Sequence, residues 1–404
     1  MEPDGATGVT IDADALVEFT RELVRIPSVH DPARGLSEQP AAELVAEQMR
    51  AFGWTPTFET VAPGRPNVIA TIDGDRPGRT LLFEGHTDVV TEGDAALWSV
   101  DPFGAELRDG RIWGRGAADM KAGVAAMLFA TDAVVRRCAE RGAFPGRIVL
   151  AALVDEEGMM AGAKHFVAAG HTEGVDGAIC CEPEAGEICH VAKGALRLRI
   201  GLTGVMAHGA MPFQGRNPIR AAGVVLQALA ELEAEVQAAH GEHEHLGRPW
   251  ITPTVLRAGE PVQMNVMPAD ASVWLDVRTV PGVDHEALAH EVGERALRAG
   301  KPTGVDARVT IIDDRPAVEI PADDPLVRAL CAAHEAVTGE PARLGGVPGA
   351  TDGTILTAHG GVPSVVYGPG GKWIAHQADE FVEVDEIVRC AEVFAEAARR
   401  FLTR

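Results

Sequence analysis

The sequence predicts a two-part α/β protein: a larger domain with a mostly parallel sheet covered by helices, interrupted by an inserted ferredoxin-like βαββαβ domain. Three observations lead to this fold class. At 404 residues the chain is longer than one ordinary core requires. Short apolar runs alternate with helical segments in its first half, as in sheets with helices on both faces. Near residue 193 the order of elements changes, and it later changes back.

The larger domain should begin with two helices and then alternate strands with helices. Apolar residues recur at helical spacing at 12–25, 41–53 and 119–137. Runs of apolar and β-branched residues predict buried strands at 67–72, 80–86, 147–157 and 177–182. A helix at 324–339, a strand at 363–369 and a helix at 384–401 would complete it. We expect this domain to comprise residues 1–192 and 314–404.

The inserted domain should comprise residues 193–313. Its predicted elements are a strand at 197–204, a helix at 217–240, strands at 252–259 and 271–280, a helix at 285–300 and a strand at 306–313. This order is the βαββαβ order of the ferredoxin-like split unit. We therefore expect a four-stranded sheet with two helices.

Charge and hydropathy exclude several classes of function. The net charge of −23 would repel nucleic acid and anionic lipid surfaces. No apolar run reaches the roughly 18 residues that a membrane-spanning helix needs. The N-terminal residues are acidic and lack the basic-then-apolar order of a secretory signal. We expect a cytoplasmic protein that binds neither nucleic acid nor membrane.

The six cysteines indicate no structural metal site and no disulfide framework. They form no CxxC pair, which is the spacing typical of zinc knuckles. Several stand in apolar stretches such as AICCE (178–182). We expect reduced, buried thiols.

Histidine and acidic residues gather where predicted strands end or a helix begins: His86, Asp88, Asp119, Glu156, Glu157, Glu182 and His376. Ligands of open α/β sheets collect at the carboxyl ends of strands. Each residue alone has a simpler explanation, such as a helix cap or a solvated turn. Together, the two histidines and four of the five acids suit two divalent ions such as Zn²⁺. One carboxylate would bridge them, and each ion would take one histidine and one terminal carboxylate. That count leaves one carboxylate spare, besides an acid needed to orient a histidine.

The chain is similar to the M20 family of metallopeptidases and deacylases over nearly its whole length. The motifs that carry the resemblance appear in the family's order: GHTDVV (85–90), GRGAADMKAG (114–123), DEEG (155–158), CEPE (181–184) and YGPG…AHQADE (367–380). The resemblance implies that residues 1–192 and 314–404 form a catalytic domain. It implies that residues 193–313 form a lid and a homodimer contact.

The resemblance also implies which residues hold the ions. Asp119 would bridge two Zn²⁺, for which Co²⁺ would be able to substitute. Glu157 and His376 would hold one ion, and His86 and Glu182 the other. All five residue types stand at the matching positions.

Two further residues of the larger domain receive roles from the resemblance. Glu156, the spare carboxylate, would be the general base, taking a proton from the attacking water and passing it to the leaving amine. Asp88, two residues beyond His86, would orient that imidazole. The ions would activate the water and polarise the scissile carbonyl.

Three residues of the inserted domain match lid residues of the family. His208 would contribute to the oxyanion site, in dimeric relatives from the partner subunit. Asn265 and Arg278 would hold the carboxylate of the substrate, and Arg suits this because its guanidinium binds carboxylates in a bidentate way. For Arg278, an ordinary ion pair on an edge strand is the alternative.

We expect a two-metal hydrolase that cleaves the amide bond of an N-acyl amino acid, of deacetylase or desuccinylase type. A dipeptidase or glutamate-type carboxypeptidase of the same family is the alternative. A catalytically silent metal-binding scaffold is also conceivable, but the intact Glu156 argues against it. GPGGK (368–372) lacks the upstream Gly and the following Ser/Thr of a phosphate loop. The sequence leaves the acyl group and the amino acid open.

Overall fold

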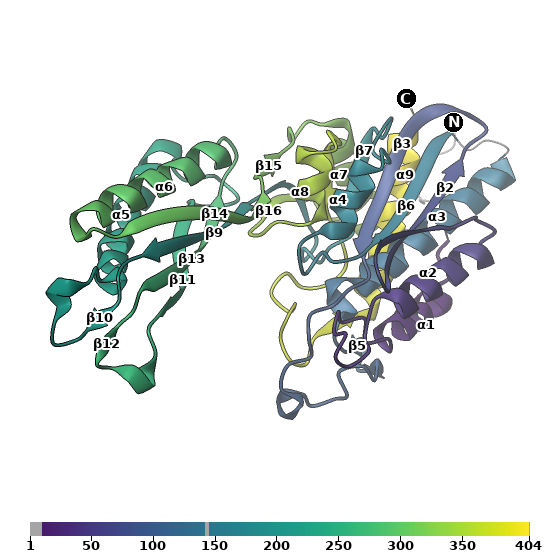
Figure 1. The fold of residues 1–404 in the computed structure, drawn as a ribbon. Helices are drawn as coiled ribbons and strands as arrows, with labels where there is room; N and C mark the ends of the chain where they lie inside the picture. The colour runs from purple at the N-terminus through teal and green to yellow at the C-terminus, as the bar shows by residue number, and fades with distance from the viewer. Residues whose placement is uncertain (1–9, 142–144, 404) are drawn as a thin grey trace. The chain divides into compact units, whose positions relative to one another are not determined.

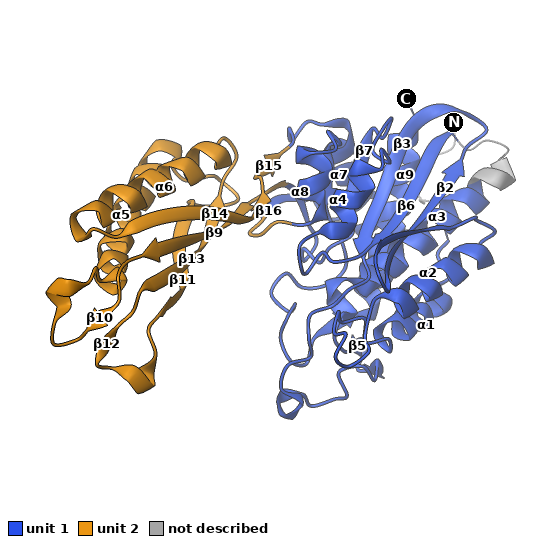
Figure 2. Ribbon diagram, viewed as in Figure 1, with its two compact units in different colours: residues 1–190, 320–346, 351–404 blue, residues 191–319, 347–350 orange. Residues whose placement is uncertain are grey.

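The structure, a computed structural model, describes residues 10–141 and 145–403, with the side chains of residues 138–141 excepted. It contains two compact units (Figure 2). Unit 1 comprises residues 1–190, 320–346 and 351–404, and unit 2 comprises residues 191–319 and 347–350. Residues 1–9, on which the expected absence of a secretory signal largely depends, lie outside the described residues.

Unit 1 is built on a sheet whose central strands are parallel (Figure 1). In spatial order the strands are β1 (Thr57–Ala62), β2 (Arg65–Asp73), β6 (Pro145–Leu153), β3 (Arg76–His86), β7 (Gly177–Cys180), β17 (Ser364–Val366) and β8 (Glu187–Ala192). Strands β6, β3, β7 and β17 run parallel to one another. Strands β2 and β8 run antiparallel to their neighbours in this row. The predicted α/β class is confirmed, with a mixed sheet whose parallel part is central.

The parallel strands are buried because helices cover both faces of the sheet. One face carries α1 (Ala13–Val24), α2 (Gln39–Ala51), α3 (Ala122–Arg141), α7 (Pro325–Thr338) and α9 (Val384–Leu402). The other face carries α4 (Ala161–Ala168) and α8 (Asp352–Ala358). Residues Leu81, Leu82 and Phe83 of β3 are fully buried, as expected for a strand covered on both sides.

Unit 2 has the predicted βαββαβ order. Its elements are β9 (Gly194–Thr203), α5 (Pro218–His240), β11 (Trp250–Ala258), β13 (Asp270–Thr279), α6 (His285–Gly300) and β14 (Asp306–Arg315). The sheet has the order β11-β13-β9-β14 and is antiparallel throughout. Helices α5 and α6 pack on this sheet around a separate apolar core. This is the ferredoxin-like arrangement.

Two smaller sheets position loops. Strand β18 (Phe381–Glu383) pairs with β5 (Arg111–Trp113), which pairs with β4 (Glu106–Arg108), in unit 1. In unit 2, β10 (Ala207–His208) pairs with β12 (Val266–Met267).

Several predicted boundaries are wrong by a few residues, and two of these errors concern the turns that carry acidic motifs. Strand β6 ends at Leu153, so the predicted strand 147–157 continues as a turn in which Asp155 has a φ of 68°. The helix predicted at 119–137 begins as α3 only at Ala122, and Asp119 lies in the preceding five-residue turn, 117–121. In both turns, backbone N–H groups donate to carboxylate side chains instead of to the backbone carbonyls of a helix or strand.

The described residues bear on two expectations, one about membrane-spanning helices and one about cysteines. Among the described residues, no helix is both long and apolar enough to cross a membrane. Five cysteines are free, and all but Cys331 are buried.

Candidate active site

The candidate site lies at the carboxyl ends of the parallel strands of unit 1. His86 is the last residue of β3, and Glu182 follows β7 by two residues. Glu156 follows β6, and His376 lies in the loop after β17. Because these four strands are parallel neighbours, their ends meet at one edge of the sheet, and the side chains that follow them come together.

Asp119 lies between the two histidines. Its Oδ1 is 3.1 Å from His86 Nε2, and its Oδ2 is 3.4 Å from His376 Nε2. One carboxylate therefore presents a different oxygen to each imidazole. This is the arrangement that a carboxylate needs in order to bridge two cations.

Each histidine also faces a second carboxylate. His376 Nε2 is 2.9 Å from Glu157 Oε1, and His86 Nε2 is 3.4 Å from Glu182 Oε1. Two sets of donor atoms, each within 4.8 Å of one another, are His86 with Asp119 and Glu157, and His86 with Glu156 and Glu182. Nitrogen and carboxylate oxygen in this mixture are the donors that Zn²⁺ takes in proteins.

Asp88 connects the end of β3 to the turn after β6. Its carboxylate oxygens accept hydrogen bonds from the backbone N–H of Glu156 at 3.2 Å and of Glu157 at 3.1 Å. His86 Nδ1 lies 3.0 Å from the carbonyl oxygen of Asp88 and 3.5 Å from its carboxylate. Asp88 thus contacts both the imidazole and the two consecutive glutamates.

Glu380 holds the turn that carries Asp119. It is 1% exposed, and its Oε1 accepts hydrogen bonds from the backbone N–H of Ala118 at 3.0 Å and of Asp119 at 3.1 Å. Its Oε2 pairs with Arg115 Nη1 at 2.5 Å. Gly116, between them, has a φ of 81°, which glycine adopts without strain. Glu380 ends the AHQADE motif, but the sequence alone indicates no role for it.

Lys372 anchors the loop that leads to His376. Its Nζ lies 2.6 Å from Glu184 Oε2 and 3.1 Å from Glu187 Oε2, and it donates to the carbonyl oxygen of Gly346 at 2.8 Å. Donor atoms of Glu184, Glu187 and Cys189 lie close enough together to hold a metal ion, but the ammonium group of Lys372 already pairs with both carboxylates there. The GPGGK segment is thus an ion-paired loop.

The site holds more negative charge than its own cations balance. Burial and the charge of Asp119 raise the pKa of Glu182 to about 8. Burial and the charge of Glu182 also raise the pKa of Glu156. Hydrogen bonds to Asp119 and Glu157 raise the pKa of His376 to about 10. Divalent cations would relieve the repulsion that these shifts reflect, so the donor set fits two such ions.

The three predicted lid residues belong to unit 2. His208 and Asn265 are neighbours there, because β10 pairs with β12 and the backbone N–H of Gly209 donates to the carbonyl oxygen of Asn265 at 2.7 Å. Arg278 forms an ion pair with Asp276 on the same strand at 3.1 Å. That strand, β13, lies between β11 and β9, so this ion pair is not on an edge strand.

Comparison with known proteins assigns the chain to a family. The family model of Peptidase family M20/M25/M40 matches residues 82–400. A succinyl-diaminopimelate desuccinylase of Cereibacter sphaeroides is 32% identical over 382 residues, covering 92% of this chain and 94% of the relative. A protein of the same name from Methylocella silvestris is 32% identical over 397 residues, covering 95% and 97%.

Solved structures share the fold at lower identity. An M20 family metallo-carboxypeptidase from Sulfolobus solfataricus has a TM-score of 0.78 at 20% identity and covers 96% of this chain and 99% of its own. A Bacillus subtilis protein described as a dinuclear metal binding peptidase from the M20 family has a TM-score of 0.72 at 19% identity, covering 96% and 98%.

Fold, sequence relatives and site together define a hydrolase that acts on amide bonds. The chain belongs to Peptidase family M20/M25/M40.

Proposed function

We propose that the chain is a two-zinc amidohydrolase that removes the acyl group of an N-acyl amino acid, of the deacetylase or desuccinylase type. The observation that carries the proposal is Asp119 between His86 and His376, each of which faces a further carboxylate. Relatives at 32% identity that bear the name succinyl-diaminopimelate desuccinylase support an N-succinyl amino acid as the substrate. Co²⁺ should substitute for Zn²⁺, because it accepts similar ligands.

In the proposed site Asp119 would bridge the two ions. Glu157 and His376 would hold one of them, and His86 and Glu182 would hold the other. When bound, the ions lower the pKa of water and polarise the scissile carbonyl. The remaining chemistry belongs to the side chains of this protein.

Glu156 is the proposed general base. Its burial and the charge of Glu182 raise its pKa, and a raised pKa brings a carboxylate closer to the value suited to proton transfer near neutral pH. Glu156 takes a proton from the attacking water and gives it to the leaving amine. Asp88 fixes the backbone of Glu156 and the orientation of the His86 imidazole.

Residues 1–192 and 314–404 would form the catalytic domain, and residues 193–313 the lid and homodimer contact. We assign recognition of the substrate carboxylate to Asn265 and Arg278, and an oxyanion contact to His208 of the partner subunit in the homodimer. The edge strand β11 supports dimerisation, since Trp250, Val255 and Leu256 are exposed on it. An exposed apolar edge strand is a surface that commonly pairs with another chain.

The competing assignment within the family is a dipeptidase or a glutamate-type carboxypeptidase. Solved structures with this fold include peptidases of several kinds. At about 20% identity, they show a shared fold and not a shared substrate. A substrate panel separates the assignments: N-succinyl-LL-diaminopimelate, N-acetylornithine, other N-acyl amino acids, and dipeptides, each with Zn²⁺ and with Co²⁺.

Preferential hydrolysis of an N-acyl amino acid is the expected result, and it should be lost in Glu156→Gln while the metal content stays unchanged. Preferential cleavage of dipeptides would favour the competing assignment. Bound metal without turnover of any carboxylate-bearing amide would identify a silent scaffold and overturn the proposal.

A further inference from the structure

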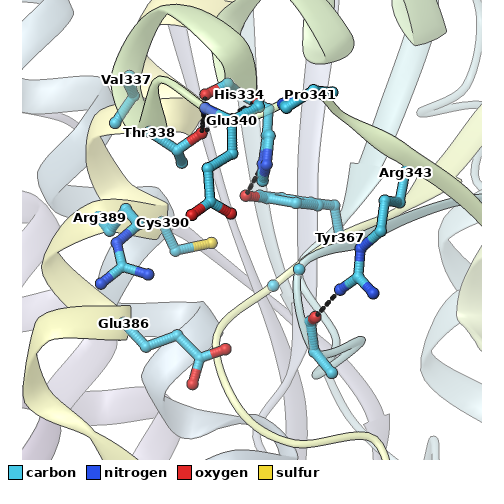
Figure 3. Close-up of a pocket in the computed structure, with 13 residues that line it drawn as sticks. His334, Val337, Thr338, Glu340, Pro341, Arg343, Tyr367, Glu386, Arg389 and Cys390 are labelled. Carbon is cyan, nitrogen blue, oxygen red and sulfur yellow. Dashed lines mark hydrogen bonds between the residues drawn. The ribbon is translucent and has the colours of Figure 1, made fainter.

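Unit 1 contains a cavity of about 810 Å³ that none of the proposed metal ligands lines. Figure 3 shows it between the end of α7, the first turns of α9 and the turn at Tyr367. Its size is within the range of small-molecule sites, which measure roughly 300–1,000 Å³. Nothing in the proposed hydrolysis uses this cavity.

Four charged side chains of opposite sign line the cavity: Arg343, Arg389, Glu340 and Glu386. In the described part of the chain, none of the four forms an ion pair with a charged side chain. Arg343 donates instead to the carbonyl oxygen of Ala185 at 3.3 Å. In Figure 3 the carboxylates of Glu340 and Glu386 extend into the space between the helices, with Arg343 and Arg389 on opposite sides. Two positive and two negative groups therefore line the same volume without a direct ion pair, although the charge of Arg389 partly offsets that of Glu386.

The inner wall of the cavity is apolar and closed to solvent. Tyr367 is 3% exposed and Cys390 is 4% exposed. The Tyr367 hydroxyl is already paired with His334 Nδ1 at 3.0 Å, so the ring presents mainly its carbon surface. Burial raises the pKa of Glu386, because a partly desolvated carboxylate is costly to ionise, and the charge of Arg389 and a backbone hydrogen bond from Gly370 offset this only in part. A ligand that brings a cation to this wall would remove that cost.

We propose that this cavity binds a free α-amino acid as a zwitterion. A guanidinium binds the amino acid's carboxylate, for which its planar fork is suited, and Glu340 and Glu386 bind its ammonium group. A simple anion would meet two carboxylates, and a simple cation would meet two guanidinium groups. Only a ligand with both charges satisfies both pairs, whichever amide the protein hydrolyses.

The cavity wall is continuous with segments that lead to the candidate active site. The backbone N–H of Ala185 donates to the carbonyl oxygen of Gly370 at 3.0 Å. A Cβ at Gly368 would stand 2.2 Å from the carbonyl oxygen of Cys181, so the wall packs directly on the segment preceding Glu182. An amino acid in the cavity should therefore restrain residues 183–187 and 367–372.

The test is calorimetric titration of the zinc-loaded protein with alanine, propionate and ethylamine, which separate the zwitterion from its two charged halves. Alanine should bind, and the two halves should bind at least about tenfold more weakly, because each loses a set of charge-assisted contacts. Arg389→Gln and Glu386→Gln should each weaken alanine binding by a similar factor. Arg328→Gln is the matched control, because Arg328 is exposed on α7 and does not line the cavity.

Location is tested by hydrogen exchange, since an amino acid could also bind at the metal ions. Alanine should slow exchange at 183–187 and 367–372 in the parent protein and in Arg328→Gln, but not in Arg389→Gln. Thermal unfolding checks that the variants fold, and Glu386→Gln substitutes for Arg389→Gln if that variant does not. The proposal is overturned if alanine does not bind, if propionate or ethylamine binds as tightly, or if both pocket variants bind alanine like the control.

Discussion

The carboxylate of Asp88 accepts a hydrogen bond from the backbone N–H of Glu156 at 3.2 Å. Its other oxygen accepts from the next N–H, that of Glu157, at 3.1 Å. The residue proposed to orient His86 thus also fixes the proposed base and a proposed ligand. Asp88 links strand ends that are adjacent in the sheet but far apart in the sequence.

Replacing Asp88 with Asn should lower kcat far more than it raises KM. An amide has only one oxygen to accept hydrogen bonds, so one of the two backbone N–H groups loses its partner, and Glu156 shifts. Loss of such an orienting contact typically costs about 10–100-fold in activity or metal affinity. Steady-state kinetics at saturating Zn²⁺ measure the effect. An Asp88→Asn protein with unchanged kcat would show that this contact positions nothing the reaction needs.

Replacing Glu380 with Gln should destabilise the fold by about 3–5 kcal/mol, the usual result of removing one partner of a buried ion pair. Arg115 would stay buried without its anion, and the turn before α3 would lose a charged acceptor. Denaturant unfolding measures the change. The control is Glu106→Gln, whose ion pair with Arg108 is exposed and worth about 0–1 kcal/mol. Equal losses in the two variants would contradict the role given to Glu380.

Metal binding should release protons and strengthen as the pH rises. The pKa of His376 is raised to about 10 in the metal-free protein, so its imidazole carries a proton at neutral pH that a metal ion must displace. The proton stabilises the metal-free fold fully below the ordinary pKa of 6.5, and this contribution disappears as the pH rises through about 10.

Zinc titrations in buffers of different ionisation enthalpy count the protons released. His376→Gln should release fewer protons than the parent protein, and its zinc affinity should depend less steeply on pH. If proton release is the same in both, the imidazole of His376 is not a ligand.

Lys372→Met should lower the zinc affinity, although Lys372 is not one of the proposed metal ligands. Lys372 is paired with Glu184 and Glu187, and its loss would leave the buried Glu184 without a cation and free the loop that carries His376. We expect a lower zinc affinity, measured by competition with a chelator. The unpaired carboxylate should also lower the free energy of unfolding, and the double variant Lys372→Met/Glu184→Gln should recover part of that loss because it removes this charge. An unchanged zinc affinity in Lys372→Met would show that the loop is held by other contacts.

The sequence predicts much of this fold because the relevant signals are local. Apolar periodicity gives α5 and α9, and buried runs give β3 and β7. Strand β16 (Arg343–Val347) was missed, because two glycines in five residues lack the side chains that mark a strand. The end of β6 was misplaced, because Val154 continues its apolar run although the backbone turns at Asp155.

In the site, too, the sequence predicts only residues that have a local signal. His86 and Glu182 have one, because each stands at the end of a predicted strand. Glu380 is not, because its contact with Asp119 joins residues 261 positions apart. Nothing in its own neighbourhood distinguishes it from a solvated glutamate. The ion pairs of Lys372 are hidden for the same reason.

The proposed function depends on Asp119 bridging two zinc ions, with His86 and His376 on separate ions. Anomalous diffraction at the zinc edge, from crystals of the zinc-loaded protein, tests it most directly. If Asp119 is the bridging ligand, two peaks per chain are expected, one beside His86 and Glu182 and one beside His376 and Glu157, with a carboxylate oxygen of Asp119 on each. A single peak, or two peaks of which one does not contact Asp119, would contradict it.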